Sequence, residues 1–302
     1  MKVLLFGANG QLGTELQRFW MSDELVSITR NECDLRDSFA ISRTIRNASP
    51  QVILNAAAYT AVDQAESDPE NCLAINGVAP GVMATEAARC GALLVHYSTD
   101  YVFDGTKAGA YDESDEANPR NQYGKSKLEG ERAIQATKAN YLLFRTSWVF
   151  SPHGKNFVTT MLRLAKERDS LKVVDDQIGS PTSAAAIAGA TARVIRIVGN
   201  DSKPSAGLYH MTAAGEVTWC GFAREICRRA HFEQTISVTP IRSEDYPTPA
   251  HRPKNSRLSN DRFSEKFGFR LSSWQEQLDE TLSSLGLAGR PLGGQEVRSS
   301  KS

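Results

Sequence analysis

The stretch KVLLFGANGQLG, residues 2–13, decides the fold. It begins with an apolar run without polar alternation, which is typical of a strand buried on both faces of a parallel sheet. Glycines follow at positions 7, 10 and 13, and a helix is expected over residues 11–20. Glycines permit a tight turn, let the backbone approach a pyrophosphate, and let a helix pack closely against a strand. The helix N-terminus adds free N–H groups, so Gly7, Gly10 and Gly13 predict a dinucleotide-binding turn, with a purely structural turn as the alternative.

The remainder of the first half alternates strands with helices. The predicted strands are 2–7, 25–29, one beginning at residue 51, 92–99 and 141–150, and the predicted helices are 36–48, 68–89 and 123–138. Phe39, Ile41 and Ile45 are expected on the apolar face of the helix over 36–48. Nearly continuous apolar strands between helices predict an α/β fold over residues 1–150, a Rossmann-like, doubly wound parallel sheet with helices on both faces.

The second half has a less regular texture from about Ser151. Expected elements are helices at 156–168, 183–198, 219–231 and 273–285, short strands at 171–174 and 207–211, and a proline-rich stretch at 245–258. We therefore expect a smaller α/β lobe over residues 151–285, partly interleaved with the sheet domain. Residues 286–302 are rich in Gly and Ser and are expected to form a disordered tail.

The composition excludes several classes of protein. The 302 residues include 35 basic and 35 acidic ones, so the formal net charge is zero, which argues against binding to nucleic acid or to an anionic membrane. The five cysteines are scattered without metal-ligand spacing, which favours reduced thiols and no metal site. No apolar run is long enough for a signal sequence or a membrane span, so we expect a soluble, cytoplasmic protein.

The end of the second predicted strand bears on the choice of nicotinamide cofactor. Dinucleotide folds often carry an acidic residue there, about 20 residues after the glycine turn, which binds the adenosine ribose. This sequence has Thr29 and Arg30 at that position. Arg30 can bind a 2′-phosphate, which favours NADPH, or it can be a solvated loop charge. Asp34 lies a few residues later and keeps NADH open.

A hydroxyl and a Tyr–Lys pair follow in the order that hydride transfer needs. Thr99 and Asp100 end the fourth predicted strand, where ligands bind in open parallel sheets. Tyr123 and Lys127 open the next helix and share one of its faces. In such an arrangement Tyr123 donates a proton to a carbonyl oxygen and Thr99 orients the substrate. Lys127 lowers the pKa of the phenol from about 10 and holds the nicotinamide ribose. The pair alone is weak evidence, but the three features in this order predict a reductase.

The same helix contains further charges. Glu129 and Glu131 are expected to be solvated. Lys125 lies two residues from Tyr123 on a different face, so its loss is expected to change little.

Some residues have two interpretations. Trp148 can stack on a sugar or pack in the core. Arg252, Lys254 and Arg257 lie together in the proline-rich stretch and suit a diphosphate, with a solvated basic loop as the alternative. His96, in the middle of a strand, is expected to be structural.

The quoted motifs resemble those of a known family. GANGQLG, NAAAYTAVDQAE, STDYVFDG and YGKSK resemble the extended short-chain dehydrogenase/reductase superfamily. FRTSWVF, DDQIGSPT, GLYHM and YPTPAHRPKNSRL are similar to the dTDP-4-dehydrorhamnose reductase family within it, and the resemblance covers residues 1–285. It implies reduction of the 4-keto group of dTDP-4-dehydro-L-rhamnose by NADPH or NADH, giving dTDP-L-rhamnose for cell-surface polysaccharide such as O-antigen. The second lobe is then mainly substrate-binding.

The resemblance also implies roles for single residues. Gly10, Gln11 and Leu12 would hold the cofactor pyrophosphate, Asp34 and Leu35 would lie near its adenine, and Ala58, Tyr59, Thr60 and Tyr97 would line it further along. Thr99 and Asp100 would meet the sugar, Trp148 would contact the deoxyhexose, and Tyr123 and Lys127 would carry out the chemistry. Some members use magnesium at a dimer contact, but no ligands for it can be assigned here. A homodimer is compatible with the sequence.

Two other functions stay open. The first is a nucleotide-sugar epimerase or dehydratase of the same superfamily. Dehydratases usually have an acidic pair beside the strand-end hydroxyl, whereas Thr99 is followed by Asp100 and Tyr101, a single carboxylate. The second is a non-catalytic module like the regulatory subunit of methionine adenosyltransferase, which has similar motifs. The TSW and PTPAHRPKNSRL segments favour the enzyme.

Overall fold

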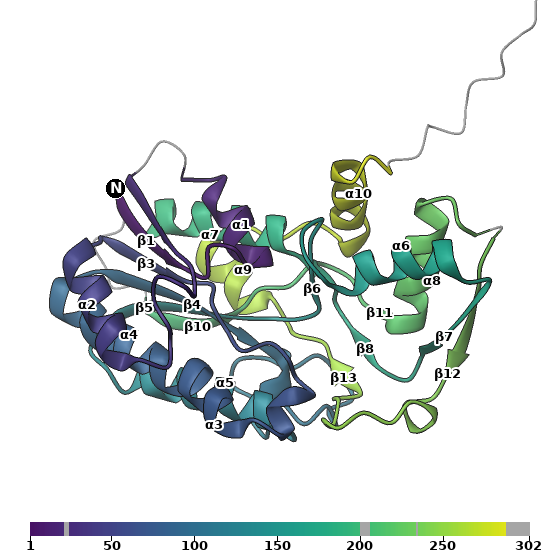
Figure 1. Cartoon of the computed structure of the whole chain (residues 1–302), viewed down its shortest axis with the longest axis horizontal. Helices are drawn as coiled ribbons and strands as arrows, with labels where there is room; N and C mark the ends of the chain where they lie inside the picture. Colours follow the sequence, from purple (N-terminus) through teal and green to yellow (C-terminus); the bar gives the residue numbers. More distant parts are fainter. Residues whose placement is uncertain (21–23, 200–205, 234, 288–302) are drawn as a thin grey trace, which may run out of the picture.

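The computed structural model describes residues 1–20, 24–199, 206–233 and 235–287. Its centre is a six-stranded parallel sheet with the strand order β10-β5-β4-β3-β1-β2 (Figure 1). The strands are β1 Lys2–Phe6, β2 Glu24–Ile28, β3 Val52–Asn55, β4 Leu93–Thr99, β5 Asn140–Thr146 and β10 Gly207–His210. This sheet, with helices on both faces, confirms the predicted doubly wound α/β fold.

The two faces of the sheet are buried by different helices. Val3 and Leu5 of β1 belong to one apolar cluster, whereas Leu4 and Phe6 belong to another. The first cluster includes side chains of α1 Gln11–Gln17, α7 Ala184–Gly199 and α9 Asp261–Phe267, and the second those of α2 Ser38–Ala48, α4 Ala79–Cys90 and α5 Gln122–Gln135 (Figure 1). The unbroken apolar run of β1 therefore follows from burial on both faces.

One apolar residue of α2 points to solvent although the sequence places it on the apolar face. α2 begins at Ser38, where the Asp37 side chain accepts hydrogen bonds from the backbone N–H groups of the first turn. Ile41 and Ile45 are buried as expected, but Phe39 is 73% exposed, so its prediction was wrong. Phe39 is two residues from Ile41, which places it about 200° around the helix, on the solvent side.

The helix predicted over 68–89 is interrupted. It consists of α3 Pro69–Leu73, a π-helical turn η2 Ala74–Val78, and α4. Inside the π turn, the Asn76 amide accepts a hydrogen bond from the Tyr59 N–H at 2.9 Å and donates one to the Tyr59 carbonyl at 3.0 Å. π turns recur at functional sites, and this one fixes the loop that follows β3.

The strand predicted over 141–150 is broken after Thr146. Trp148 has φ +50°, in the left-handed region that residues with a side chain rarely adopt. The chain then leaves the large sheet and forms β6 Val149–Phe150, which pairs with β9 Thr182–Ser183. Apolar patterning could not reveal the break, because Phe150 is as buried as the residues of β5.

The second half builds a smaller lobe and also returns to the large sheet. α6 Phe157–Glu167, α8 Trp219–Arg229 and α10 Trp274–Ser284 share one apolar cluster with the parallel pair β7 Ser170–Val174 and β12 Ser237–Ile241. A small sheet contains β11 Val217–Thr218, β8 Ile178–Gly179 and β13 Asn255–Ser256, and single turns of 3-10 helix are η1 Gln64–Glu66, η3 Asp100–Val102 and η4 Ser243–Asp245. In contrast, β10, α7 and α9 pack with the elements of the first half.

The sequence did not predict every element of the second half. Neither β12, which is largely exposed and contains a proline, nor the short α9 is predicted by the sequence. The domain boundary near residue 150 stays a prediction. The predicted tail falls, from residue 288 onward, outside the described residues. Within the described part, no helix has the length and apolarity needed to cross a membrane.

Glu131 is not a solvated helix charge, as the sequence suggested. It is 1% exposed and forms a bidentate ion pair with Arg145 of β5, with N–O distances of 2.9 and 2.6 Å. The Ser98 hydroxyl of β4 donates a further hydrogen bond to the same carboxylate. Glu129, in contrast, is half exposed and pairs with Arg132 on the surface, as expected.

We predict that Glu131→Gln lowers the free energy of unfolding by about 3–5 kcal/mol, because it leaves the Arg145 charge buried without a counter-charge. Glu129→Gln on the same helix is the matched control, and its effect should stay within about 0.5 kcal/mol. Urea denaturation of both variants measures the difference. Equal, small effects would show that the buried pair contributes little to folding.

Candidate active site

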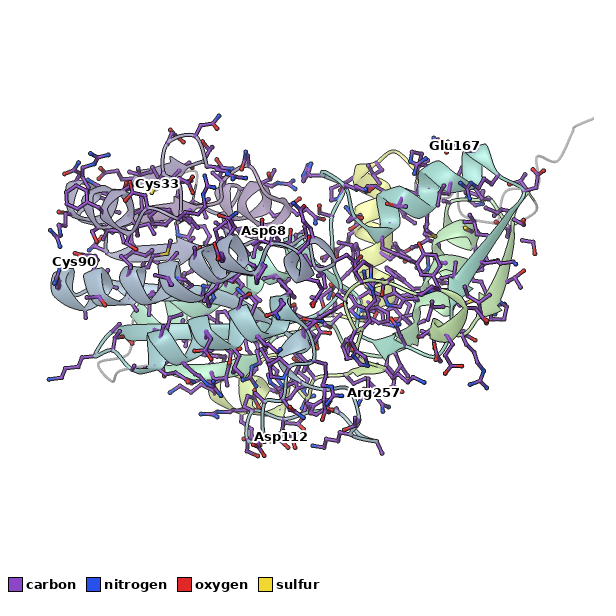
Figure 2. The ribbon with its side chains drawn as sticks, turned by 60° about the horizontal axis from the view of Figure 1, so that its bottom comes forward. Cys33, Asp68, Cys90, Asp112, Glu167 and Arg257 are labelled. Carbon is purple, nitrogen blue, oxygen red and sulfur yellow. The ribbon has the colours of Figure 1, made fainter. Side chains whose placement is uncertain are left out.

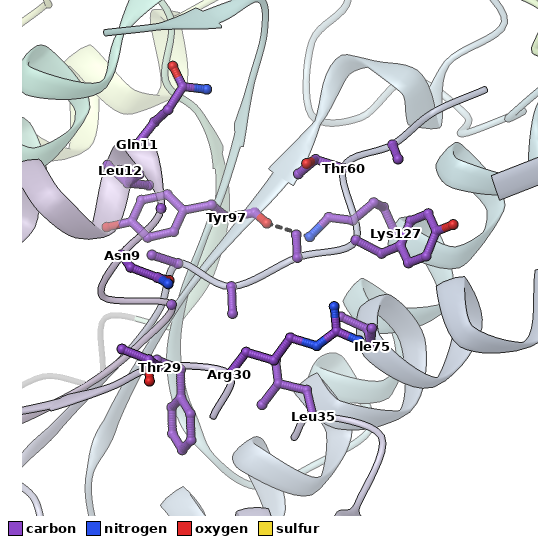
Figure 3. A pocket seen from close by; sticks show the side chains of 18 of the residues that line it. Asn9, Gln11, Leu12, Thr29, Arg30, Leu35, Thr60, Ile75, Tyr97 and Lys127 are labelled. Carbon is purple, nitrogen blue, oxygen red and sulfur yellow. Dashed lines mark hydrogen bonds between the residues drawn. The ribbon is translucent and has the colours of Figure 1, made fainter. Parts of the chain in front are cut away.

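A cleft of about 800 Å³ lies beyond the carboxyl ends of β1, β3 and β4 (Figure 3). Pockets for small ligands and cofactors have volumes of roughly 300–1,000 Å³. Nearly all residues predicted to bind a cofactor line this cleft: Gly7, Gly10, Gln11, Leu12, Arg30, Asp34, Leu35, Ala58, Tyr59, Thr60, Tyr97, Tyr123 and Lys127. Gly13 is the exception, because it lies behind the turn.

The glycine turn has no room for side chains at two of its three positions. Gly7 has φ +81°, and a Cβ there would lie 2.6 Å from the Ala57 backbone nitrogen. A Cβ on Gly13 would lie 2.0 Å from the Gly7 carbonyl oxygen, so Gly13 lets α1 pack directly against the turn. Gly10 is less constrained, since its Cβ would lie 3.3 Å from that same oxygen. The turn therefore presents backbone atoms, and not side chains, to the cleft.

Arg30 and Asp34 lie in the same part of the cleft but differ in their partners. The Asp34 carboxylate accepts hydrogen bonds from the Arg36 guanidinium, with Nε–O distances of 3.0 and 2.9 Å. These bonds lower the pKa of Asp34 to about 2. Arg30 has no hydrogen bond or ion pair to any other described residue. Its guanidinium is therefore the group that can meet an anionic ligand here.

Lys127 is buried at the inner end of the cleft. Its Nζ donates a hydrogen bond to the Tyr97 carbonyl at 2.7 Å (Figure 3). It also lies 3.1 Å from His96 Nε2. Burial lowers the pKa of Lys127 to about 8, although the charges of Glu131 and Cys72 act in the opposite direction. The ammonium and the uncharged amine are therefore close in free energy near neutral pH.

Tyr123 lies one helical turn before Lys127, and its phenol is close enough to the Thr99 hydroxyl for that group to lower its pKa. Burial raises the pKa of Tyr123 above its ordinary value, and the nearby Asp100 and Tyr101 add to this. The expected lowering by Lys127 is not among the main influences on this pKa, which burial dominates. The phenol therefore keeps its proton at neutral pH.

Asp100 lies beside this pair and is 2% exposed. Its Oδ1 accepts a hydrogen bond from the Thr99 hydroxyl at 3.1 Å, and burial raises its pKa to about 6. One carboxylate oxygen, Oδ2, has no hydrogen-bond partner among the described residues. A buried acceptor without a donor is costly, so it marks a place where a ligand hydroxyl can bind.

The residues predicted to bind substrate lie toward the second lobe. Trp148 stacks on Trp219 with ring centroids 3.5 Å apart, and its indole occupies the space next to Gly179. Arg252 forms an ion pair with Asp63 at 2.7 Å and a hydrogen bond with the Tyr101 hydroxyl.

The predicted basic cluster is not a cluster of free charges. Lys254 pairs with Asp176 at 3.4 Å, and Arg257 pairs with Glu216 at 3.3 Å. Arg257 lies beside the loop that contains Asp112 (Figure 2). The three basic residues diverge because the proline-rich stretch is extended, and each meets a different acid.

Sequence reasoning also missed residues at this site. Asn9, Ala57 and Asn71 line the cleft. Asn9 lies inside the glycine turn, so its position was a usable signal. His96 has a structural position, as expected, but it also contacts Lys127, which no local pattern indicates. Among the described residues, no group of His, Cys, Asp or Glu side chains is arranged to hold a metal ion.

The chain is similar to proteins of known function along nearly its whole length. Residues 1–286 match the family model described as RmlD substrate binding domain. A dTDP-4-dehydrorhamnose reductase of Burkholderia thailandensis is 47% identical, with 91% of this chain and 96% of the relative covered. One of Escherichia coli K12 is 43% identical, with 94% and 98% covered. The crystal structure of dTDP-4-dehydrorhamnose reductase from Bacillus anthracis in complex with NADP has a TM-score of 0.88 and 34% identity, with 94% of this chain and 100% of that chain covered.

We predict that Gly13→Ala lowers the free energy of unfolding by about 1–3 kcal/mol, since the new methyl group must displace α1 from the turn. Gly10→Ala is the matched control in the same turn and should be clearly milder. Thermal unfolding of both variants, followed by circular dichroism, tests the order. If Gly10→Ala were the more harmful change, the packing of α1 would not depend on Gly13.

Proposed function

The chain belongs to the RmlD substrate-binding-domain family, and we propose that it reduces the 4-keto group of dTDP-4-dehydro-L-rhamnose with NAD(P)H, giving dTDP-L-rhamnose. The observation that carries this proposal is that Tyr123 and the buried Lys127, one helical turn apart, line the inner end of a dinucleotide-sized cleft, with Thr99 beside Tyr123. The names of the relatives support the same reaction.

The cleft suits a nicotinamide dinucleotide. Gly7 and Gly10 leave backbone at the turn, where a pyrophosphate can approach closely. Ala56, Ala57 and Ala58 form a wall of small side chains along the cleft. Lys127 can donate to the nicotinamide ribose. When bound, the cofactor supplies the hydride that reaches the keto carbon.

Tyr123 is the proton donor in this proposal. Its phenol is protonated because burial raises the pKa, and a neutral phenol is the state that can give a proton to the developing alkoxide. Thr99 orients the phenol and the substrate oxygen through its own hydroxyl. Asp100 offers the unpaired Oδ2 to a sugar hydroxyl. Only one carboxylate is present next to Thr99, which suits reduction better than dehydration.

The second lobe would hold the rest of the substrate. The exposed part of Trp148, stiffened by its stack on Trp219, suits the apolar face of a deoxyhexose. Arg252 can serve a diphosphate only by sharing its guanidinium with Asp63. Because Asp63 lies in the segment after β3, the Arg252–Asp63 ion pair would set the distance between that segment and the sugar nucleotide.

NADPH is the cofactor we favour. The Asp34 carboxylate, which would bind ribose hydroxyls, is engaged by Arg36, whereas Arg30 is without a partner among the described residues. A guanidinium in that position can pair with a 2′-phosphate. Magnesium has no part in this proposal. The cytoplasmic location and the homodimer stay predictions.

Tyr123→Phe is expected to lower kcat by about 10²–10⁴-fold, because only the proton donor is lost. The affinity for NADPH should be nearly unchanged. The assay generates the keto-sugar nucleotide from dTDP-glucose and follows NADPH consumption. One NADPH consumed per product also separates a reductase from an epimerase. Lys125→Ala is the control on the same helix, and activity of Tyr123→Phe close to that of this control would exclude the mechanism.

Arg30→Asp is expected to weaken NADPH binding by about 10–100-fold, which corresponds to the loss of one charge-assisted contact. NADH binding should be affected much less, so the preference shifts toward NADH. Titrations of both cofactors by fluorescence give the ratio of the dissociation constants. Arg43→Asp on the exposed side of α2 makes the same charge change elsewhere. If it shifted the ratio equally, the effect would be general electrostatics.

A further inference from the structure

Asn121 is the residue before α5 and is buried, with 3% of its surface exposed. Its Oδ1 accepts a hydrogen bond from the Gly124 backbone N–H at 2.7 Å, which caps the helix. Its Nδ2 donates one to the His251 backbone carbonyl, also at 2.7 Å. An amide oxygen only accepts and an amide nitrogen only donates, so the two contacts fix one orientation of the side chain. Asn121 therefore joins the first turn of α5, which contains Tyr123, to the proline-rich stretch.

Two further groups hold the same part of the proline-rich stretch. The Asp63 carboxylate accepts hydrogen bonds from the Ala250 backbone N–H at 3.3 Å and from the Arg252 guanidinium at 2.7 Å. The Tyr101 hydroxyl accepts one from the same guanidinium at 3.2 Å. Residues 250–252 are thus anchored to three places in the first half of the chain: the segment after β3, the turn η3, and the N-terminus of α5.

Tyr101 connects these anchors to Tyr123. The two rings meet edge to face, with centroids 5.6 Å apart and an angle of 78° between their planes. The Tyr101 backbone lies against the first turn of α5, where a Cβ on Gly124 would be 2.1 Å from the Tyr101 carbonyl oxygen. Tyr123, Tyr101 and Arg252 are therefore successive members of one packed group. A displacement of residues 250–252 would change the position of Arg252 relative to the phenol of Tyr123.

We propose that Asn121 is a positioning residue for the sugar nucleotide, whose amide nitrogen holds residues 250–252 in place beside Tyr123. In the proposed function, on which this inference rests, Arg252 binds the diphosphate while Tyr123 protonates the sugar. Both groups act on one substrate molecule, so a fixed separation between them lowers the cost of orienting it. The other end of the amide caps α5, a task that serine or aspartate performs equally well. Among these three residues, only asparagine also has an amide nitrogen to bind the His251 carbonyl.

Asn121→Ser tests the two ends of the amide separately. The serine hydroxyl can cap α5, but its side chain is one bond shorter and leaves the His251 carbonyl without its donor. In the NADPH-consumption assay the KM for the keto-sugar nucleotide should rise about 10-fold, because one buried hydrogen bond is lost. The value of kcat, the dissociation constant of NADPH and the melting temperature should stay close to those of the wild type. An unchanged KM, or an equal loss of NADPH affinity, overturns the proposal.

Ser273→Ala is the matched control, since Ser273 caps α10 and has no part in the site. It should lower the melting temperature, as the loss of a cap does, and leave KM unchanged. An increase of KM in this variant as large as in Asn121→Ser would show that KM follows stability, which overturns the proposal.

Asn121→Asp provides a second variant in case the serine variant does not fold. It keeps the cap and the shape of the side chain but places a carboxylate oxygen against the His251 carbonyl, so KM should rise as well. Gln122→Glu adds the same charge one residue later, and an equal rise of KM there overturns the proposal.

Hydrogen–deuterium exchange tests the anchor without any substrate. A peptide over residues 246–258 should exchange faster in Asn121→Ser than in the wild type, whereas a peptide over α5 should not. Equal exchange of the first peptide in both proteins overturns the proposal. Wild-type protein that consumes no NADPH with the keto-sugar nucleotide would instead contradict the proposed function, so the two failures are distinguishable.

Discussion

Arg145 of β5 and Glu131 of α5 form a buried, bidentate ion pair, to which Ser98 of β4 adds a third contact. Neither charge is stable alone in the interior, so the pair selects one register of α5 against the sheet. Lys127 and Tyr123 lie one and two turns earlier on the same helix face. The position of the two proposed active-site residues therefore depends on an interaction that touches neither of them.

The cleft is built unequally by the two halves of the chain. Its cofactor end is made mostly of backbone and small side chains, which are fixed by strands of a single sheet. The residues predicted to bind the sugar lie outside the lining of this cleft and depend on contacts between segments far apart in sequence, such as Arg252 with Asp63 and Trp148 with Trp219. In the proposed function, exchange of the sugar can disturb these contacts without disturbing the sheet.

The sequence predicted what is local and missed what is distant. The glycine turn and the Tyr123–Lys127 spacing are properties of short segments, because a turn or a helix face is set by neighbours in the chain. The burial of Glu131 and the contact of His96 with Lys127 arise between elements, so no periodicity marks them. The exposure of Phe39 shows that apolar character alone does not assign a residue to the buried face of a helix, even next to two buried residues.

β10, contributed by the second half, lies at the edge of the six-stranded sheet beside β5, and α7 covers one face. A fragment ending near residue 150 would therefore expose the β5 edge and an apolar surface, both of which promote aggregation. Recombination between genes could not easily move the nucleotide-binding half as a separate module. During synthesis on the ribosome, the sheet is complete only after most of the chain has emerged. The stable folding of the first half therefore depends on residues that are made late.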